Sequence, residues 1–528
     1  MSTPFIQLDA REVSSLGGAR PLGSRTAMVA VFLILFGSYA YFWQGRDWNS
    51  ASRLMLVYAL GDQGTILING LEDQTGDKAV YRGRFYTDKQ PGYSLLALPV
   101  YLAAKVGLGL EPHPLNQPGF AHWPADYWVT LGTSGVFTAG TGALLTGLAI
   151  WLGVAPVWAM LPGLGYGIAT PAYVYATLAY GHQTTSFLLL AAFLAVAWGA
   201  ASPRPLGCAF LAGLFSGYAC TIELSVAPVV IILGGWVLFR VLGRGWPATA
   251  LATFLAGGFG PLVLLLTYNF LAYGSAFDMG YAHHAVPRFR EVHSNQNPLG
   301  LRLPRWELVR PLLLGEYRGL LVYAPVLVLA PLGWLNLRRR GRGALALGSV
   351  AICLAIFLVN LSYPEWTGGW CTGPRLLVPL LPFGMMGVMG VLLDTGRDGL
   401  NRVLRGLALA LVLAGAGVML LCVGVGGRIP ETLFQAPLSQ PLSGVVWPLW
   451  RGDPIPRWWI GGRFGGNLVA TFWPQVNNLQ TLSGGWQWVQ FLPLVLGQLV
   501  SIGTAVWLVR HKAAGAAVVQ AVRPPMDA

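Results

Sequence analysis

Charged residues are scarce in this chain: of its 528 residues, 10% are charged and 54% are apolar. Ordinary soluble domains carry about 25% charged residues. Apolar runs of roughly 17 to 25 residues recur along the sequence, which is the helix length that crosses a bilayer core. The composition therefore excludes a water-soluble globular protein and predicts an all-α polytopic membrane protein.

Several signatures of other protein classes are missing as well. The chain has five cysteines, four of which lie inside apolar runs, so no disulfide framework is expected. It has no phosphate-cradling glycine-rich loop, no dinucleotide-binding fingerprint and no GxSxG elbow in a strand-turn-helix setting. Nothing in the sequence supports a nucleotide-driven mechanism.

The basic residues predict the orientation of the chain. The net charge is +13, but Lys and Arg form short clusters between apolar runs and no amphipathic basic face, so nucleic acid is not an expected partner. Short connections and the two tails hold sixteen of the 34 basic residues but only five of the 21 acidic ones. By the positive-inside rule, these connections and both termini are cytoplasmic.

Twelve apolar runs have the composition of membrane spans. The first follows three arginines without a small-residue cleavage site, so we interpret it as an uncleaved signal anchor. One more run, Ser94 to Leu110, contains Pro99 and Lys105 and is not followed by a basic connection; we therefore expect an interfacial helix there. The twelve expected spans cover residues 26–43, 127–152, 155–176, 181–200, 206–222, 224–239, 247–268, 319–337, 343–361, 376–393, 405–424 and 489–509.

These spans divide the chain into four parts. They are a cytoplasmic tail (1–25), a multi-spanning core (26–424), a large outer loop (425–488), and a last span with its cytoplasmic tail (489–528). The large outer loop is rich in tryptophan, which is typical either of an interfacial aromatic belt or of a surface that stacks sugar rings. Three further outer loops interrupt the core, at 44–126, 269–318 and 362–375.

The first outer loop holds candidate catalytic residues. Six acids lie in its part up to Gly92, among them Asp47, Asp77 and Asp88, and Asp88 is followed directly by Lys89. A carboxylate at a membrane surface can act as a general base toward a hydroxyl, and a neighbouring Lys can hold a phosphate. A solvated charged loop is the alternative for each acid taken alone.

The other outer loops hold candidate phosphate- and substrate-binding residues. Arg318 and Arg375 each begin a helix, where backbone N–H groups favour an anion; snorkelling to lipid headgroups is the alternative. The three histidines of the second outer loop have neither metal-ligand spacing nor close acidic neighbours, so no metal or other cofactor is indicated. Substrate-binding candidates at outer helix ends and loops are His182, Glu223, Tyr317, Trp366 and Trp370. For His182 and Glu223, an interfacial histidine and a structural ion pair are the alternatives.

Together these motifs resemble the multi-spanning glycosyltransferases of superfamily C, particularly bacterial relatives of protein O-mannosyltransferases and lipid A aminoarabinose transferases. The resemblance covers roughly residues 45 to 385. It rests on Asn49-Ser50-x-x-Arg53, Thr75-Gly76-Asp77-Lys78-Ala79, Tyr86-x-Asp88-Lys89-x-Pro91-Gly92, Gly181-His182, Arg318-Gly319-Leu320 and Trp366-x-Gly368-Gly369-Trp370-x-x-Gly373-Pro374-Arg375.

The resemblance implies a glycosyltransferase that moves a sugar from a polyprenyl-phosphate carrier to an envelope glycan, lipid or protein. The reaction would take place on the outer face of the bacterial inner membrane. Lys89 matches the family's donor-phosphate contact, and Arg318 and Arg375 look like further phosphate contacts. Many relatives carry an acid directly after the first span, where this chain has Asp47-Trp48-Asn49, so the base stays open among Asp47, Asp77 and Asp88.

Two other functions compete with this interpretation. A twelve-span secondary transporter would keep ionisable groups near the bilayer midplane on broken, repeated helices, and no half-to-half repeat is evident here. An oligosaccharide polymerase or ligase would share the outward-facing site but use a diphosphate-linked donor. The sequence specifies neither the sugar nor the acceptor.

Overall fold

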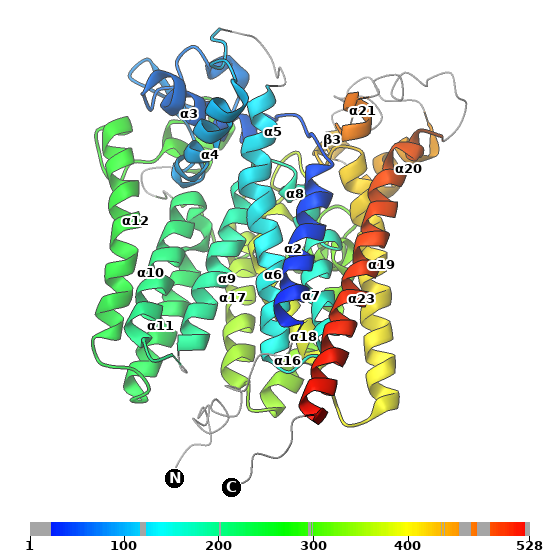
Figure 1. Ribbon diagram of the computed structural model, residues 1–528. Coiled ribbons are helices and arrows are strands. Elements are labelled where there is room, and N and C mark those ends of the chain that lie inside the picture. Colours follow the sequence, from blue (N-terminus) through cyan, green and yellow to red (C-terminus); the bar gives the residue numbers. More distant parts are fainter. Residues whose placement is uncertain are drawn as a thin grey trace.

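The computed structural model is a bundle of helices with a cap of shorter elements at one end (Figure 1). The cap includes α3 (Trp48–Gln63) and α4 (Gly92–Leu108), and we call this end the loop face. The opposite end, where α2 (Ser24–Ala40) begins and α23 (Leu492–Val522) ends, is the terminal face. The structure describes residues 23–116, 123–199, 202–293, 297, 299–433, 436–437, 439–453, 466–472 and 486–522.

Nine helices among these described residues are long and apolar enough to cross a membrane. The predicted all-α polytopic membrane fold is therefore confirmed. The nine segments include α5 (Pro124–Thr130), which continues through η2 (Leu131–Gly135) into α6 (Val136–Trp151), together with α9 (Gly181–Gly199), α10 (Pro205–Ile222), η3 (Leu224–Val226) with α11 (Ala227–Leu242), α12 (Ala250–Tyr273), α17 (Gly343–Ser362), η7 (Arg375–Leu380) with α18 (Leu381–Leu392), α19 (Asp398–Gly424) and most of α23.

The other three predicted spans are shorter or broken. Helix α2 has 17 residues, and the run predicted at 155–176 is divided at Pro171 into α7 (Pro156–Ile168) and α8 (Ala172–Ala176). The run predicted at 319–337 is divided at Pro325, because proline lacks the N–H that a continuous helix needs. Its pieces are α15 (Leu320–Tyr323), η6 (Pro325–Leu329) and α16 (Ala330–Arg339). The count of twelve spans stays a prediction.

Glycines set the close packing of several helix pairs. A Cβ on Gly213 of α10 would lie 1.9 Å from the Phe254 carbonyl oxygen of α12, and one on Gly257 of α12 would lie 2.1 Å from the Phe210 carbonyl oxygen. In membrane proteins small residues let helix backbones approach in this way, because lipid provides no hydrophobic force between helices. Helices α10 and α12 therefore pack as a tight pair.

The basic connections share the terminal face. Arg340, between α16 and α17, donates a hydrogen bond to the carbonyl of Asp394, between α18 and α19. Trp246, between α11 and α12, donates from Nε1 to the Gly199 carbonyl at the end of α9, at 3.2 Å. The clustering of basic connections predicted from the sequence thus corresponds to one side of the bundle (Figure 1).

Helix α4 belongs to the cap and lies beside α3 (Figure 1). Gly92, its first residue, lies so close to the end of α10 that a Cβ there would be 2.1 Å from Oγ1 of Thr221. The predicted helix outside the span count is therefore confirmed. The remaining short elements are η1 (Glu72–Gln74), β1 (Lys78–Tyr81), β2 (Arg84–Thr87), η4 (Gly280–His283), α13 (Pro287–Val292), η5 (Trp306–Leu308), α14 (Val309–Leu314), β3 (Thr432–Leu433), β4 (Ala436–Pro437), η8 (Leu442–Val446), α20 (Trp447–Arg451), α21 (Leu468–Phe472) and η10 (Trp486–Phe491).

Candidate active site

A cavity of about 860 Å³ lies between the cap and the loop-face ends of α11 and α17. This volume is in the upper part of the usual range for ligand pockets. Eight of the eleven predicted site residues line the cavity: Asp47, Asp77, Asp88, Lys89, His182, Glu223, Trp370 and Arg375. The folded chain therefore gathers side chains from the first outer loop, from three helix ends and from the third outer loop around one space.

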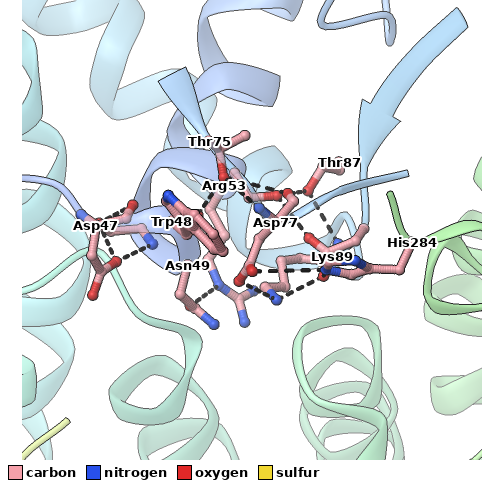
Figure 2. A network of polar contacts seen from close by, with 12 residues as sticks. Asp47, Trp48, Asn49, Arg53, Thr75, Asp77, Thr87, Lys89 and His284 are labelled. Carbon is pink, nitrogen blue, oxygen red and sulfur yellow. Dashed lines mark hydrogen bonds and ion pairs between the residues drawn. The ribbon is translucent and has the colours of Figure 1, made fainter. Parts of the chain in front are cut away.

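A β-hairpin brings Asp77 and Asp88 together. Strands β1 and β2 are antiparallel, with Lys78 opposite Thr87, and their two-residue turn has φ 49° at Arg82 and 73° at Gly83. Positive φ at both positions is the geometry of the tight turns that match strand twist. The residues just outside the last pair, Asp77 and Asp88, consequently meet at the open end of the hairpin. Figure 2 shows this end with Asp77.

Lys89 bridges the two aspartates. Its ammonium nitrogen lies 2.7 Å from a carboxylate oxygen of Asp77 and 2.7 Å from one of Asp88. Burial alone would raise the pKa of Asp77, but the ammonium of Lys89 and the imidazole of His284 outweigh burial and lower it. Burial alone would lower the pKa of Lys89, but the two carboxylates raise it. Asp77 and Lys89 are therefore both charged at neutral pH.

His284 joins this cluster through a third extended segment. It forms a β-bridge with Ala79 of β1, and the N–H of Ala285 donates to the Lys78 carbonyl at 2.8 Å. This pairing places Nε2 of His284 3.7 Å from an oxygen of each aspartate (Figure 2). Within the described residues, Asp77, Asp88 and His284 are thus a group of side chains that could hold a metal ion. The Lys89 ammonium already balances charge between the two carboxylates.

A second charged cluster surrounds Glu223, at the junction of α10 and α11. Arg53 of α3 donates to Glu223 at 2.6 Å, and Nδ1 of His182 lies 3.7 Å away. Burial alone would raise the pKa of Glu223, but contact with His182 and Arg53 outweighs burial and lowers it. Arg375 and Lys89 act on Glu223 in the same direction. Cations from several elements therefore converge on this part of the cavity.

Arg375 differs from the other cations of the cavity. Its guanidinium carbon lies 5.3 Å from the ring centre of Tyr180. In the part of the chain that the structure describes, it has no ion pair, and its buried Nε has no hydrogen-bond partner. Burying a charge without a partner is costly. This guanidinium is therefore available to an anionic ligand.

Asp47 lies next to Arg375, through Tyr180. The Tyr180 hydroxyl donates to Oδ2 of Asp47, and Oδ1 accepts from the N–H and the hydroxyl of Ser50, each at 2.8 Å. Asp47 is thus the N-cap of α3, which fixes its side chain at the cavity wall. Among the described residues, it forms no ion pair with a Lys or Arg, unlike Asp77, Asp88 and Glu223.

Three predicted site residues lie outside the cavity lining and shape the third outer loop. Arg318 is fully buried and donates to the carbonyls of Thr367 and Gly369 at 2.7 and 2.8 Å. Its guanidinium carbon lies 3.8 Å from the ring centre of Tyr317, and that ring contacts Trp366 edge-on. These residues support the loop that carries Trp370, whereas the sequence suggested direct contacts with ligand.

Sequence reasoning missed several cavity residues. The Arg82-Gly83 turn signals the hairpin that joins Asp77 and Asp88, but no signal in the sequence places His284 beside them. Tyr281, whose ring centre lies 5.7 Å from the Lys89 nitrogen, has no such signal; burial raises its pKa to about 12. Arg53 belongs to the Asn49-Ser50-x-x-Arg53 motif, but the sequence predicted no role for it.

One side of the cavity is apolar. Pro228 and Ile231 of α11 and Ile356 and Val359 of α17 line it. Ile231, in this lining, is also 76% exposed. The cavity therefore borders the lateral surface of the bundle, which faces lipid in a membrane.

Fold and site define a polytopic helical membrane protein with a charged cavity that borders lipid. Among solved structures, the chain is similar to ArnT of Cupriavidus metallidurans. The crystal structure bound to undecaprenyl phosphate has 17% identity and a TM-score of 0.46, over 92% of this chain and 77% of that chain. The apo structure has 15% identity and a TM-score of 0.46, over 92% and 76%. No protein-family model and no curated protein matches the chain.

Proposed function

We propose that this protein is a glycosyltransferase that moves a sugar from a polyprenyl-phosphate carrier to an acceptor hydroxyl. The observation that carries the proposal is the Arg375 guanidinium, which lines the cavity without an ion-pair partner among the described residues. A partly buried cation without an ion-pair partner favours an anionic ligand, and the planar guanidinium matches a phosphate.

The apolar side of the cavity supports a lipid as the carrier of that phosphate. The lining of α11 and α17 changes from Ile231 and Ile356 to charged and aromatic groups toward the loop face. An amphiphile with a long apolar tail and one phosphate fits this gradient, since the tail can stay in the bilayer while the headgroup meets Arg375. A soluble nucleotide sugar has no apolar tail that would contact this side of the cavity.

Asp47 is the proposed general base. Asp77 and Asp88 are both paired with Lys89, so their charge is already engaged. Asp47 has no such cation partner in the described part of the chain, and its carboxylate stands at the cavity wall. A carboxylate with free lone pairs next to the reacting centre can take a proton as a hydroxyl attacks. We therefore propose that Asp77 and Asp88 hold the Lys89 side chain in position.

The proposed reaction is a single displacement. The acceptor oxygen forms a bond to the anomeric carbon while the bond from that carbon to the phosphate oxygen breaks, and the electron pair leaves with the lipid phosphate. The acceptor proton goes to Asp47, and Arg375 and Lys89 stabilise the charge that develops on the phosphate. The reaction needs no nucleotide or reductant, because the lipid phosphate is itself the leaving group.

The proposed orientation places the site on the outer face of the bacterial inner membrane. The basic connections lie on the terminal face, and the positive-inside rule assigns that face, with both termini, to the cytoplasm. The cavity lies at the opposite end of the bundle. Envelope glycans, lipids and proteins on that side are the proposed acceptors.

The experiment that tests the phosphate site is a binding measurement with undecaprenyl phosphate. Arg375→Met should weaken its binding about 10- to 100-fold, the loss of one or two charge-assisted hydrogen bonds. Arg84→Met, which removes an exposed arginine from the hairpin, is the matched control and should bind normally. Equal affinity of the Arg375 variant and the wild-type protein would contradict the proposal.

A further inference from the structure

Asn360 is a buried amide whose polar atoms have no partner. It lies in the last turn of α17, is 1% exposed and is among the residues that line the cavity. Neither its Nδ2 nor its Oδ1 has a hydrogen-bond partner within the described part of the chain. Buried polar groups are almost always paired, so an exception of this kind needs a reason.

Two other buried amides in the bundle, Asn269 and Gln183, are paired. Asn269 donates to the Ala276 carbonyl at 3.2 Å, and Gln183 accepts from the Tyr166 hydroxyl at 2.7 Å. Leaving an amide unpaired costs free energy, whereas an apolar side chain of similar size at the same position would not carry that cost. Packing alone therefore does not explain an asparagine at position 360.

The position of Asn360 along α17 narrows the choice of ligand group. Ile356, one turn toward the terminal face, belongs to the apolar lining, and Tyr363, on the other side, belongs to the polar wall, with its hydroxyl 3.0 Å from His293. Asn360 thus stands where the cavity changes from lipid-facing to polar. In a lipid-linked sugar, the tail ends at the phosphate and the sugar follows directly, so the phosphate and the sugar are the two groups that can reach this level.

The chemistry of the amide distinguishes between those two groups. A phosphate oxygen only accepts hydrogen bonds, so it would leave Oδ1 of Asn360 unpaired. A sugar hydroxyl both donates and accepts and can pair with either amide atom. We propose that Asn360 is a specificity-determining residue that binds a hydroxyl of the transferred sugar. This inference rests on the proposed function and names the part of the donor that the residue recognises.

The test compares Asn360→Leu with the wild-type protein in three measurements. With undecaprenyl-phosphate-linked pentoses and hexoses as donors, kcat/KM for the preferred donor should fall about 10- to 100-fold, because sites built to bind a hydroxyl depend on it strongly. The Kd for undecaprenyl phosphate without sugar should stay within about twofold. The Tm should stay the same or rise, since an unpaired buried amide has been removed.

A deoxy donor series separates recognition from structure. Removing the recognised hydroxyl should lower kcat/KM for the wild-type protein and have little further effect on Asn360→Leu. Unchanged kcat/KM for every donor, an equal loss of affinity for bare undecaprenyl phosphate, or a lowered Tm would each overturn the inference. Absence of transfer by the wild-type protein would overturn the proposed function and this inference with it, and is recognised before any variant is made.

Discussion

Asp47 is the N-cap of α3 and the proposed general base, and one substitution separates these two roles. Asparagine caps a helix about as well as aspartate, but it cannot take a proton. Asp47→Asn should therefore keep α3 and the Tm intact while kcat falls by about 10²- to 10⁴-fold, the usual contribution of a general base. The measurement is turnover of the lipid-linked donor beside thermal unfolding of the same preparation.

Asp47→Ala is the companion variant. It removes the cap as well as the base, so it should lose activity and also about 1 kcal/mol of stability. Full turnover by Asp47→Asn would show that another carboxylate, Asp77 or Asp88, is the base.

The cluster of Asp77, Asp88 and Lys89 predicts how stability depends on pH. Because the folded pKa of Asp77 lies below its ordinary value of 3.8, this carboxylate contributes stability above that pH, and the contribution is lost as the pH falls further. The raised pKa of Lys89 contributes stability that is fully present below 10.5 and is lost as the pH rises through the raised value. The measurement is Tm from about pH 2 to about pH 6 in detergent, which includes the range below 3.8 where the Asp77 contribution is lost.

Asp77→Asn serves as the comparison in that pH series. It lacks the titrating group, so its Tm should fall less steeply on acidification than the wild-type Tm. Parallel Tm curves for the two proteins would show that Asp77 is not held as a carboxylate by Lys89.

At the scale of elements, close helix packing predicts that alanine at two glycines of α12 changes stability by different amounts. Gly257→Ala would place a methyl group against the backbone of α10, so it should cost about 1 to 3 kcal/mol, as overpacking usually does. Gly260→Ala, on the same helix, meets no atom within 4 Å and is the control. Thermal unfolding of both variants tests this; equal Tm values would contradict tight pairing of α10 and α12.

Elements differ in how far the sequence predicts them. Long apolar runs and the interfacial helix α4 follow from local composition, because each depends on its own residues and on the bilayer thickness. The convergence of Asp77, Asp88 and His284 does not, because it depends on hairpin register and on a β-bridge between segments about 200 residues apart. Arg318 was predicted to contact phosphate, and in the structure its guanidinium donates to backbone carbonyls of a neighbouring loop, a contact that a basic residue at a helix start also suits.

At the scale of the whole molecule, charge clustering predicts which face is exposed to the periplasm. Gln63 is exposed on the loop face, at the end of α3, and Arg339 is exposed on the terminal face, at the end of α16. In intact cells, a membrane-impermeant maleimide should label Gln63→Cys but label Arg339→Cys only after permeabilisation. The reverse pattern would contradict the proposed orientation. Wild-type protein is the control, since its five cysteines are buried or partly buried.

The central claim is transfer of a sugar from a lipid phosphate, and the most direct measurement follows both products of that reaction. Purified protein is incubated with doubly labelled undecaprenyl-phosphate sugars and an envelope fraction as the source of acceptor. We expect free undecaprenyl phosphate and acceptor-bound sugar in equal amounts, and formation of both at least about 10²-fold slower with Asp47→Asn. An intact donor, with sugar or lipid only moved across a vesicle membrane, would contradict this expectation and indicate a transporter; consumption of diphosphate-linked donors alone would indicate a polymerase or ligase.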